Sequence, residues 1–205
     1  MPMTLVLDDS GGSTAAWAGL ATEAFELSVG LATRLIPLED VRVTFKCDPG
    51  ATIPEWGVGG ETMDAHHVYV AMDPSTVQGV ECISRTLLHE FHHAIRWRST
   101  SLELDDLSFR DMLASEGLAV LFEEEALGTA PFFVNPEPAD PDVALALRAL
   151  DERPCNRSEW FFGAGRVPPA FGWALGYRLC KDYAHRSHTS ASTLVATPAV
   201  EIIAT

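Results

Sequence analysis

The sequence is most informative where it reads Arg85-Thr86-Leu87-Leu88-His89-Glu90-Phe91-His92-His93-Ala94-Ile95-Arg96. Apolar residues recur here at spacings of three and four, which predicts a helix with one buried stripe formed by Val80, Ile83, Leu87, Phe91 and Ile95. We expect this helix to begin at Ser75 or Thr76, just after Asp73-Pro74. Two histidines and a glutamate in HExxH spacing therefore lie on one long helix.

The HExxH spacing is suited to a metal ion and a base. His89 and His93 are one helical turn apart, so both imidazoles can reach one ion. Glu90 lies about 100° further round the helix, beside the metal, where it can take a proton from a water that the metal activates. The pattern predicts zinc-dependent hydrolysis with Glu90 as general base, and a helix with ordinary histidines is the plain alternative. His92 fits neither role, so we expect it beside the site, facing substrate or simply exposed.

A catalytic zinc needs a third protein ligand and an open position for water. The motif extension that supplies a third histidine requires glycine and histidine at positions that hold Arg96 and Ser99 here. The next histidines along the chain are His185 and His188. We therefore look for the third ligand among carboxylates that follow the first helix.

Glu116 is the preferred third ligand. Ser108 followed by Asp111 resembles a capping box and predicts a second helix with Glu116 near its middle. Small residues beside it, Gly117 and Ala119, are expected to let this helix approach the first one closely. The rival carboxylates Asp105, Asp106 and Asp111 lie where helix capping explains them. The plain alternative is a solvent-exposed Glu116, as we expect for Glu123, Glu124 and Glu125.

Three segments carry a resemblance to a known family: Leu88–Arg96, Ser115–Ala119 and Pro169–Tyr177. In this order they resemble the bacterial YjaZ-like family of predicted zinc-dependent proteases, over roughly residues 40 to 185. A glutamate on the helix after HExxH also resembles the gluzincin class of zincins, of which thermolysin is the familiar member. The chain departs from the thermolysin pattern at Ser115 and Val120, where asparagine and aspartate would stand. The carboxylate that would orient a ligand histidine is therefore not identified, and Asp111 and Glu123 are candidates.

The resemblance implies a zincin-like α+β fold with a small antiparallel or mixed sheet packed on the HExxH helix and a mainly helical remaining lobe. It also implies peptide-bond hydrolysis, with zinc held by His89, His93 and Glu116 and with Glu90 as base. A donor to the negative charge that builds on the substrate carbonyl oxygen completes such a site. Tyr177, on a helix expected over 171–185, is our candidate, beside an ordinary buried tyrosine as the alternative. The competing donors are His185, Arg178 and His66.

Composition limits the possible partners. The net charge of −15 and the pI near 4.7 argue against nucleic acid and anionic lipid and favour a neutral or basic peptide or protein substrate. Four scattered cysteines indicate mostly buried thiols rather than a disulfide framework or a cysteine zinc site. We find no signal peptide or membrane span, so we expect a cytoplasmic protein. The sequence does not indicate an oligomeric state.

We expect one zincin-like metallopeptidase domain over residues 1–205. An N-terminal helix (13–36) and a sheet fill about 1–75, the metal-binding helices about 76–127, and a helical part about 140–205 with a short helix near 141–151. Strands are expected at 41–45 and 66–72, the latter as the sheet edge that pairs with extended substrate. Gly57, Gly59 and Gly60 indicate a surface loop or a flap. Neither His66 nor His67 is favoured as a ligand.

We therefore interpret the sequence as that of a zinc metallopeptidase of gluzincin type. One alternative is a binding or regulatory domain in which zinc only staples two helices. Glu90 argues against it, because a structural zinc site has four protein ligands and needs no adjacent base. The other alternative is a zinc hydrolase that acts on a non-peptide amide, which shares the same chemistry.

Overall fold

The computed structural model describes residues 2–10, 14–100 and 106–204. The chain forms two compact units, residues 1–98 and 99–205, and each is described by itself. The first holds a four-stranded sheet with two helices, and the second is helical, so the expected α+β class is confirmed. The organisation as one domain over 1–205 stays a prediction.

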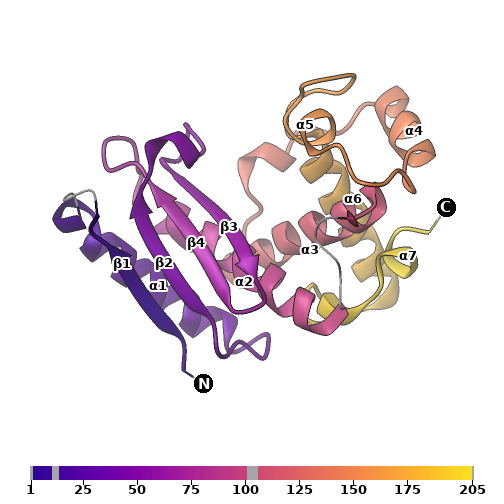
Figure 1. The fold of residues 1–205 in the computed structure, drawn as a ribbon. Helices are drawn as coiled ribbons and strands as arrows, with labels where there is room; N and C mark the ends of the chain where they lie inside the picture. The colour runs from indigo at the N-terminus through magenta and orange to yellow at the C-terminus, as the bar shows by residue number, and fades with distance from the viewer. Residues whose placement is uncertain (1, 11–13, 101–105, 205) are drawn as a thin grey trace. The chain divides into compact units, whose positions relative to one another are not determined.

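The sheet of the first unit is mixed, as expected. Its strands are β1 (Thr4–Asp8), β2 (Arg42–Cys47), β3 (Val58–Asp64) and β4 (His67–Met72), in the order β1-β2-β4-β3. The first three in this order run parallel, and β3 pairs antiparallel with β4 (Figure 1). The strands expected at 41–45 and 66–72 are present, whereas β1 and β3 were not predicted. β1 was missed because it is short and ends in an acidic residue. β3 was missed because its sequence, Val-Gly-Gly-Glu-Thr-Met-Asp, has no clear apolar alternation.

The prediction that residues 66–72 form the sheet edge is wrong. β4 lies between β2 and β3, and β3 is the edge strand on that side. The physical reason is apolar content, since Val68, Val70, Ala71 and Met72 are all buried, as suits an interior strand. Gly59 and Gly60, expected in a loop or a flap, are part of β3, and Gly57 directly precedes it. The polar, glycine-containing strand therefore forms the edge.

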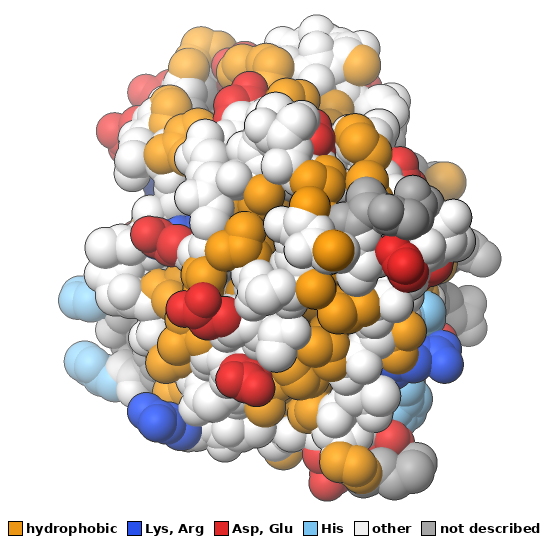
Figure 2. Space-filling view, turned by 90° about the vertical axis from the view of Figure 1, so that its left-hand side faces the viewer, with side chains coloured by type: hydrophobic (Ala, Val, Ile, Leu, Met, Phe, Trp, Pro, Cys, Tyr) orange, Lys and Arg blue, Asp and Glu red, His pale blue; other side chains and the backbone are white. Residues whose placement is uncertain are grey.

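Two helices cover one face of this sheet: α1 (Ala18–Ala32) and α2 (Val80–Thr100) (Figure 1). They contact each other through a hydrogen bond from Ser28 Oγ to the Ser84 carbonyl (3.4 Å). The alternate side chains Val43, Phe45, Val68 and Val70 are buried, whereas Thr44 and Tyr69 between them are half-buried. One face of the sheet therefore carries the core of the unit. Figure 2 shows the molecular surface from the β1 side. Hydrophobic side chains gather across the middle of this surface, with acidic side chains among them.

The start of α2 differs from the prediction. The helix begins at Val80, not at Ser75 or Thr76. The Asp73 carboxylate accepts hydrogen bonds from the backbone N–H (2.9 Å) and the hydroxyl (2.6 Å) of Ser75, which makes a turn there. Gly79, with a φ of 124°, separates this turn from the helix. The predicted stripe holds from Ile83 onward, where Ile83, Leu87, Phe91 and Ile95 are buried.

The second unit contains α3 (Phe109–Leu127), α4 (Asp140–Arg148), α5 (Arg157–Trp160), α6 (Phe171–Ser187) and α7 (Ala199–Ile202). The predicted capping box is present, because Ser108 and Asp111 each accept from the other's backbone N–H. Gly128 ends α3 with a φ of 80°. None of the helices in the described ranges is long and apolar enough to cross a membrane. All four cysteines are free thiols, as expected, but only two of them, Cys82 and Cys180, are buried, so the expectation that most are buried is wrong.

The two longest helices of this unit, α3 and α6, meet at a pair of glycines. A Cβ added to Gly117 would collide with the backbone of Gly176, and one added to Gly176 would lie 2.5 Å from the Leu113 carbonyl oxygen. Gly117 therefore lets α3 approach α6, and the prediction that it serves the HExxH helix is wrong. The sequence identified the need for a close approach but not the partner helix.

Candidate metal centre

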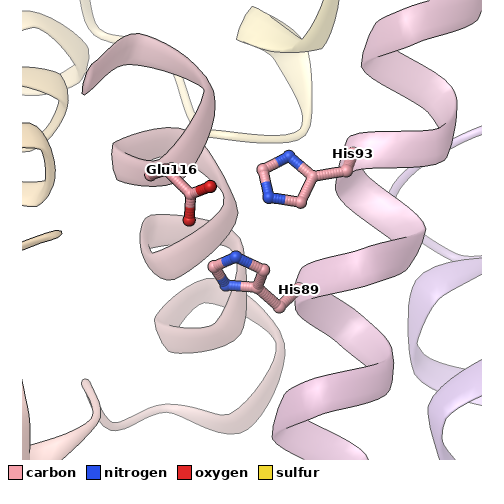
Figure 3. A group of neighbouring side chains, drawn as sticks. All are labelled: His89, His93 and Glu116. Atoms are coloured by element: carbon pink, nitrogen blue, oxygen red, sulfur yellow. The ribbon is translucent and has the colours of Figure 1, made fainter. Parts of the chain in front are cut away.

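The two histidines of the HExxH pattern lie on neighbouring turns of α2, with their side chains on the same side. Their ring centroids are 4.7 Å apart and the rings meet edge to face. His93 is buried and His89 half-buried. Figure 3 shows both rings and the Glu116 carboxylate of α3 pointing toward one another. One ligand atom from each of the three residues lies within 4.8 Å of the other two.

This donor set fits zinc. Two imidazole nitrogens and one carboxylate oxygen are the protein ligands of several catalytic zinc sites. Donors around a tetrahedral zinc ion lie about 3.4 Å apart, because each is about 2.1 Å from the ion. A spacing of up to 4.8 Å is thus a small adjustment away from a bound geometry.

Glu90 is buried beside this group and is held by the edge strand β3. The Thr62 hydroxyl lies 2.7 Å from Glu90 Oε2 and 3.0 Å from the Glu90 carbonyl oxygen. Its one proton goes to the carboxylate, which is the charged acceptor and the shorter contact. Two residues earlier, a Cβ on Gly60 would lie 2.7 Å from Glu90 Cγ and 2.8 Å from Oε1. The same face of β3 therefore provides both the donor and the room for this carboxylate.

Glu116 is held within the second unit by side chains from α5 and α6. The indole Nε1 of Trp173 donates a hydrogen bond to Glu116 Oε2 at 2.6 Å. The Arg157 guanidinium lies 3.6 Å from Oε1, with 55% of that side chain exposed. Sequence reasoning missed Thr62, Trp173 and Arg157. No local spacing links them to the motif, because each comes from an element distant in the chain.

Tyr177 is engaged with neighbouring side chains on α3 and α6. Its hydroxyl donates to Glu124 Oε2 (2.7 Å) and accepts from Lys181 Nζ (2.6 Å). Burial raises the pKa of Tyr177, and the Glu124 carboxylate adds to the increase, so the phenol keeps its proton at neutral pH. Its role as a donor to substrate stays a prediction. Of its competitors, Arg178 pairs with Glu137 (3.6 Å), His66 contacts Asp40, and His185 is exposed.

The other candidate carboxylates are occupied elsewhere or lie outside the described residues. Asp111 caps α3 and pairs with Arg153 (3.1 Å), and Asp106 lies 3.6 Å from the same guanidinium. Asp105 falls outside the described residues. The role of Asp111 as the orienting partner of a ligand histidine stays a prediction. His67 contacts the Thr44 hydroxyl (3.0 Å). Within the described residues, the metal group contains neither His66 nor His67.

Two expectations about exposure are corrected. Glu123 is buried, Glu124 is bonded to Tyr177 and Lys181, and Glu125 is bonded to Ser192. The expectation of three solvent-exposed glutamates is therefore wrong, because α6 and the segment after it cover the end of α3. His92 is also buried, which excludes the exposed position that was one of its options.

Comparisons with known proteins agree with the donor set. The "Uncharacterized protein YjaZ" of Bacillus subtilis (strain 168) is 26% identical over 125 residues, which are 57% of this chain and 48% of that protein. The chain thus matches about half of this relative's length. No solved structure matches the chain. A family model described as "Predicted Zn-dependent protease (DUF2268)" matches residues 20–204. The resemblance to the YjaZ-like family is confirmed. Zinc is the cofactor that both the family and the donor set indicate. The chain belongs to the DUF2268 family of predicted Zn-dependent proteases.

Proposed function

We propose that the protein is a zinc peptidase in which His89, His93 and Glu116 hold the metal and Glu90 is the general base. The observation that carries this proposal is the close group of two imidazoles and a carboxylate, with a further buried carboxylate next to one ligand in sequence. Three protein ligands are the number that leaves a zinc position open for water. A zincin-like arrangement of the HExxH helix and the sheet belongs to this proposal.

Zinc, when bound, supplies a Lewis acid that acidifies water and polarises the scissile carbonyl. Glu90 then takes a proton from the attacking water while the water oxygen bonds to the carbonyl carbon. As the carbon–nitrogen bond breaks, Glu90 passes this proton to the leaving amine. The hydrogen bond from Thr62 orients the carboxylate for both transfers. Tyr177 stays our candidate donor to the carbonyl oxygen, and it must exchange its bond to Glu124 to act there.

The proposed substrate is an extended peptide that adds a strand to the β3 edge. β3 carries Gly60 and Thr62 against Glu90, so a peptide paired with this strand would have its backbone near the base. Main-chain hydrogen bonds along a strand edge give affinity with little side-chain selectivity. The acidic chain favours a neutral or basic peptide.

A zinc staple without catalysis is the second candidate. It would need no buried carboxylate held ready beside the ligands, and Glu90 with its donor Thr62 argues against it. A zinc hydrolase that acts on a non-peptide amide would use the same residues, and substrate screening separates it from a peptidase.

The test compares wild type with Glu90→Gln for zinc content and for cleavage of a mixed peptide library. We expect the variant to keep stoichiometric zinc and to lose about 100- to 10,000-fold in cleavage rate, as for removal of a general base. Glu81→Gln is the matched control, because Glu81 lies on the same helix with 75% of its side chain exposed. A wild type that binds zinc and cleaves no peptide would overturn the peptidase proposal, and a wild type that takes up no zinc would overturn the metal site.

A further inference from the structure

We infer that Trp173 is a positioning residue for Glu116, which it holds in the orientation that binds the metal. This inference rests on the proposed zinc site. Trp173 contacts the proposed third ligand rather than the metal, and the rings of Phe133, Phe161 and Phe162 surround it.

The contact between the two side chains follows from how α3 and α6 meet. Gly117 and Gly176 face each other where the two backbones are closest. Glu116 directly precedes Gly117, and Trp173 lies about one helical turn before Gly176. The close approach thus brings the indole N–H within 2.6 Å of the Glu116 carboxylate. A wider helix spacing would break this hydrogen bond.

The indole is itself fixed by other rings. Phe161, Phe162 and Phe133 contact it nearly edge to face, with ring centroids 5.1, 5.3 and 6.2 Å away. Such contacts orient an aromatic side chain as well as bury it. Three rings therefore restrict the direction from which Trp173 donates, whereas Arg157, another neighbour of Glu116, is more than half exposed.

The chemistry of the donor also suits a metal ligand. An indole N–H is neutral and can only donate, so it occupies one lone pair of the carboxylate without adding positive charge. The carboxylate keeps its full negative charge for the cation. Hydrogen bonds to ligating carboxylates typically contribute about 10- to 100-fold to metal affinity.

The chain offers a matched control about one turn further along α6 and about two turns further along α3. Tyr177 donates from α6 to Glu124 of α3, as Trp173 donates to Glu116. Tyr177→Phe and Trp173→Phe each remove one donor from this helix pair and keep a ring in place. Only Trp173→Phe removes the donor to the proposed ligand.

The experiment measures zinc affinity by competition with a chelator, together with the melting temperature of the metal-free and zinc-loaded proteins. For Trp173→Phe we expect zinc affinity to fall by about 10- to 100-fold and the zinc-dependent rise in melting temperature to shrink. For Tyr177→Phe we expect zinc affinity within about twofold of wild type. Trp173→Leu, which is apolar and has no hydrogen-bond donor, is a second variant with the same expected loss, for use should Trp173→Phe fold poorly.

The outcomes separate this inference from the proposed function. Unchanged zinc affinity in a folded Trp173→Phe or Trp173→Leu would overturn the inference and leave the zinc site intact. An equal loss in Tyr177→Phe would also overturn it, because loosening of the α3–α6 pair would then explain both. Failure of the wild type to bind zinc would instead overturn the proposed site.

Discussion

Two buried glutamates, Glu90 and Glu116, are held in different ways. Glu90 accepts from the hydroxyl of Thr62 on an edge strand, with a glycine leaving space beside it. Glu116 accepts from the indole of Trp173, which three aromatic rings hold in place. A hydroxyl rotates about its C–O bond and can both donate and accept, whereas an indole N–H only donates in one direction. The difference suits the proposed roles, since Glu90 as a base would gain and lose a proton and Glu116 as a metal ligand would keep one orientation.

The largest expected effect that tests this contrast comes from Gly60→Val. The new side chain would occupy the space of the Glu90 carboxylate, since even a Cβ would lie 2.8 Å from Oε1. We expect kcat/KM for a peptide substrate to fall by about 100-fold, as for a displacement of a catalytic group by about 1 Å, with zinc affinity nearly unchanged. Gly30→Ala is the control, because a Cβ there meets no atom within 4 Å. Full activity of Gly60→Val would show that the function of Glu90 does not depend on the space that Gly60 leaves beside it.

Thr62→Val tests the hydroxyl alone. Valine keeps the branched shape of threonine and removes the donor to Glu90 Oε2. We expect kcat to fall by about tenfold, with KM and zinc affinity unchanged, because a hydrogen bond to a charged group contributes about 1.5 kcal/mol or more. Thr62→Ser restores a hydroxyl and should recover most of the rate. A loss of rate in Thr62→Ser as large as in Thr62→Val would point to packing rather than to the hydroxyl.

Arg157→Gln gives the smallest expected effect. Arg157 lies 3.6 Å from Glu116 Oε1 but is 55% exposed, so solvent screens most of its charge. We expect zinc affinity to stay within about threefold of wild type, since exposed ion pairs contribute about 0–1 kcal/mol. The zinc affinities of Arg157→Gln and Trp173→Phe are measured side by side by competition with a chelator. A tenfold or larger drop would show that Arg157, not Trp173, is the main holder of Glu116.

Much of the metal centre could be predicted because its signals are local. One helical turn separates His89 from His93 whatever surrounds them, and the Ser108–Asp111 box marks the start of the helix that carries Glu116. The partners of these residues could not be predicted. Thr62 and Trp173 lie far from Glu90 and Glu116 in the sequence, and only tertiary packing brings them together. For the same reason the sequence showed that Gly117 needs a close neighbour but not that α6 provides it.

Strand order was the other point that local pattern could not decide. Alternation and apolar content identified β2 and β4. The apolar content of β4 suits an interior strand, but its place there depends on β3, which the local pattern did not identify. β3 escaped prediction because its glycines weaken the strand pattern. Those glycines include Gly60, which leaves the space beside Glu90. The glycine that weakens the strand pattern in the sequence thus leaves the space that the proposed base occupies.

The glycine pair of α3 and α6 also places a chemical reporter inside the second unit. Cys180 is buried, its Sγ lies 3.7 Å from the Ala114 carbonyl oxygen, and a Cβ on Gly117 would come within 2.9 Å of it. An alkylating reagent reaches this thiol only in molecules whose helices have separated locally. Cys155, by contrast, is half-buried, and burial raises its pKa to about 12, which keeps its thiolate scarce. The labelling rate of Cys180 therefore measures the free energy of opening the helix pair that holds Glu116.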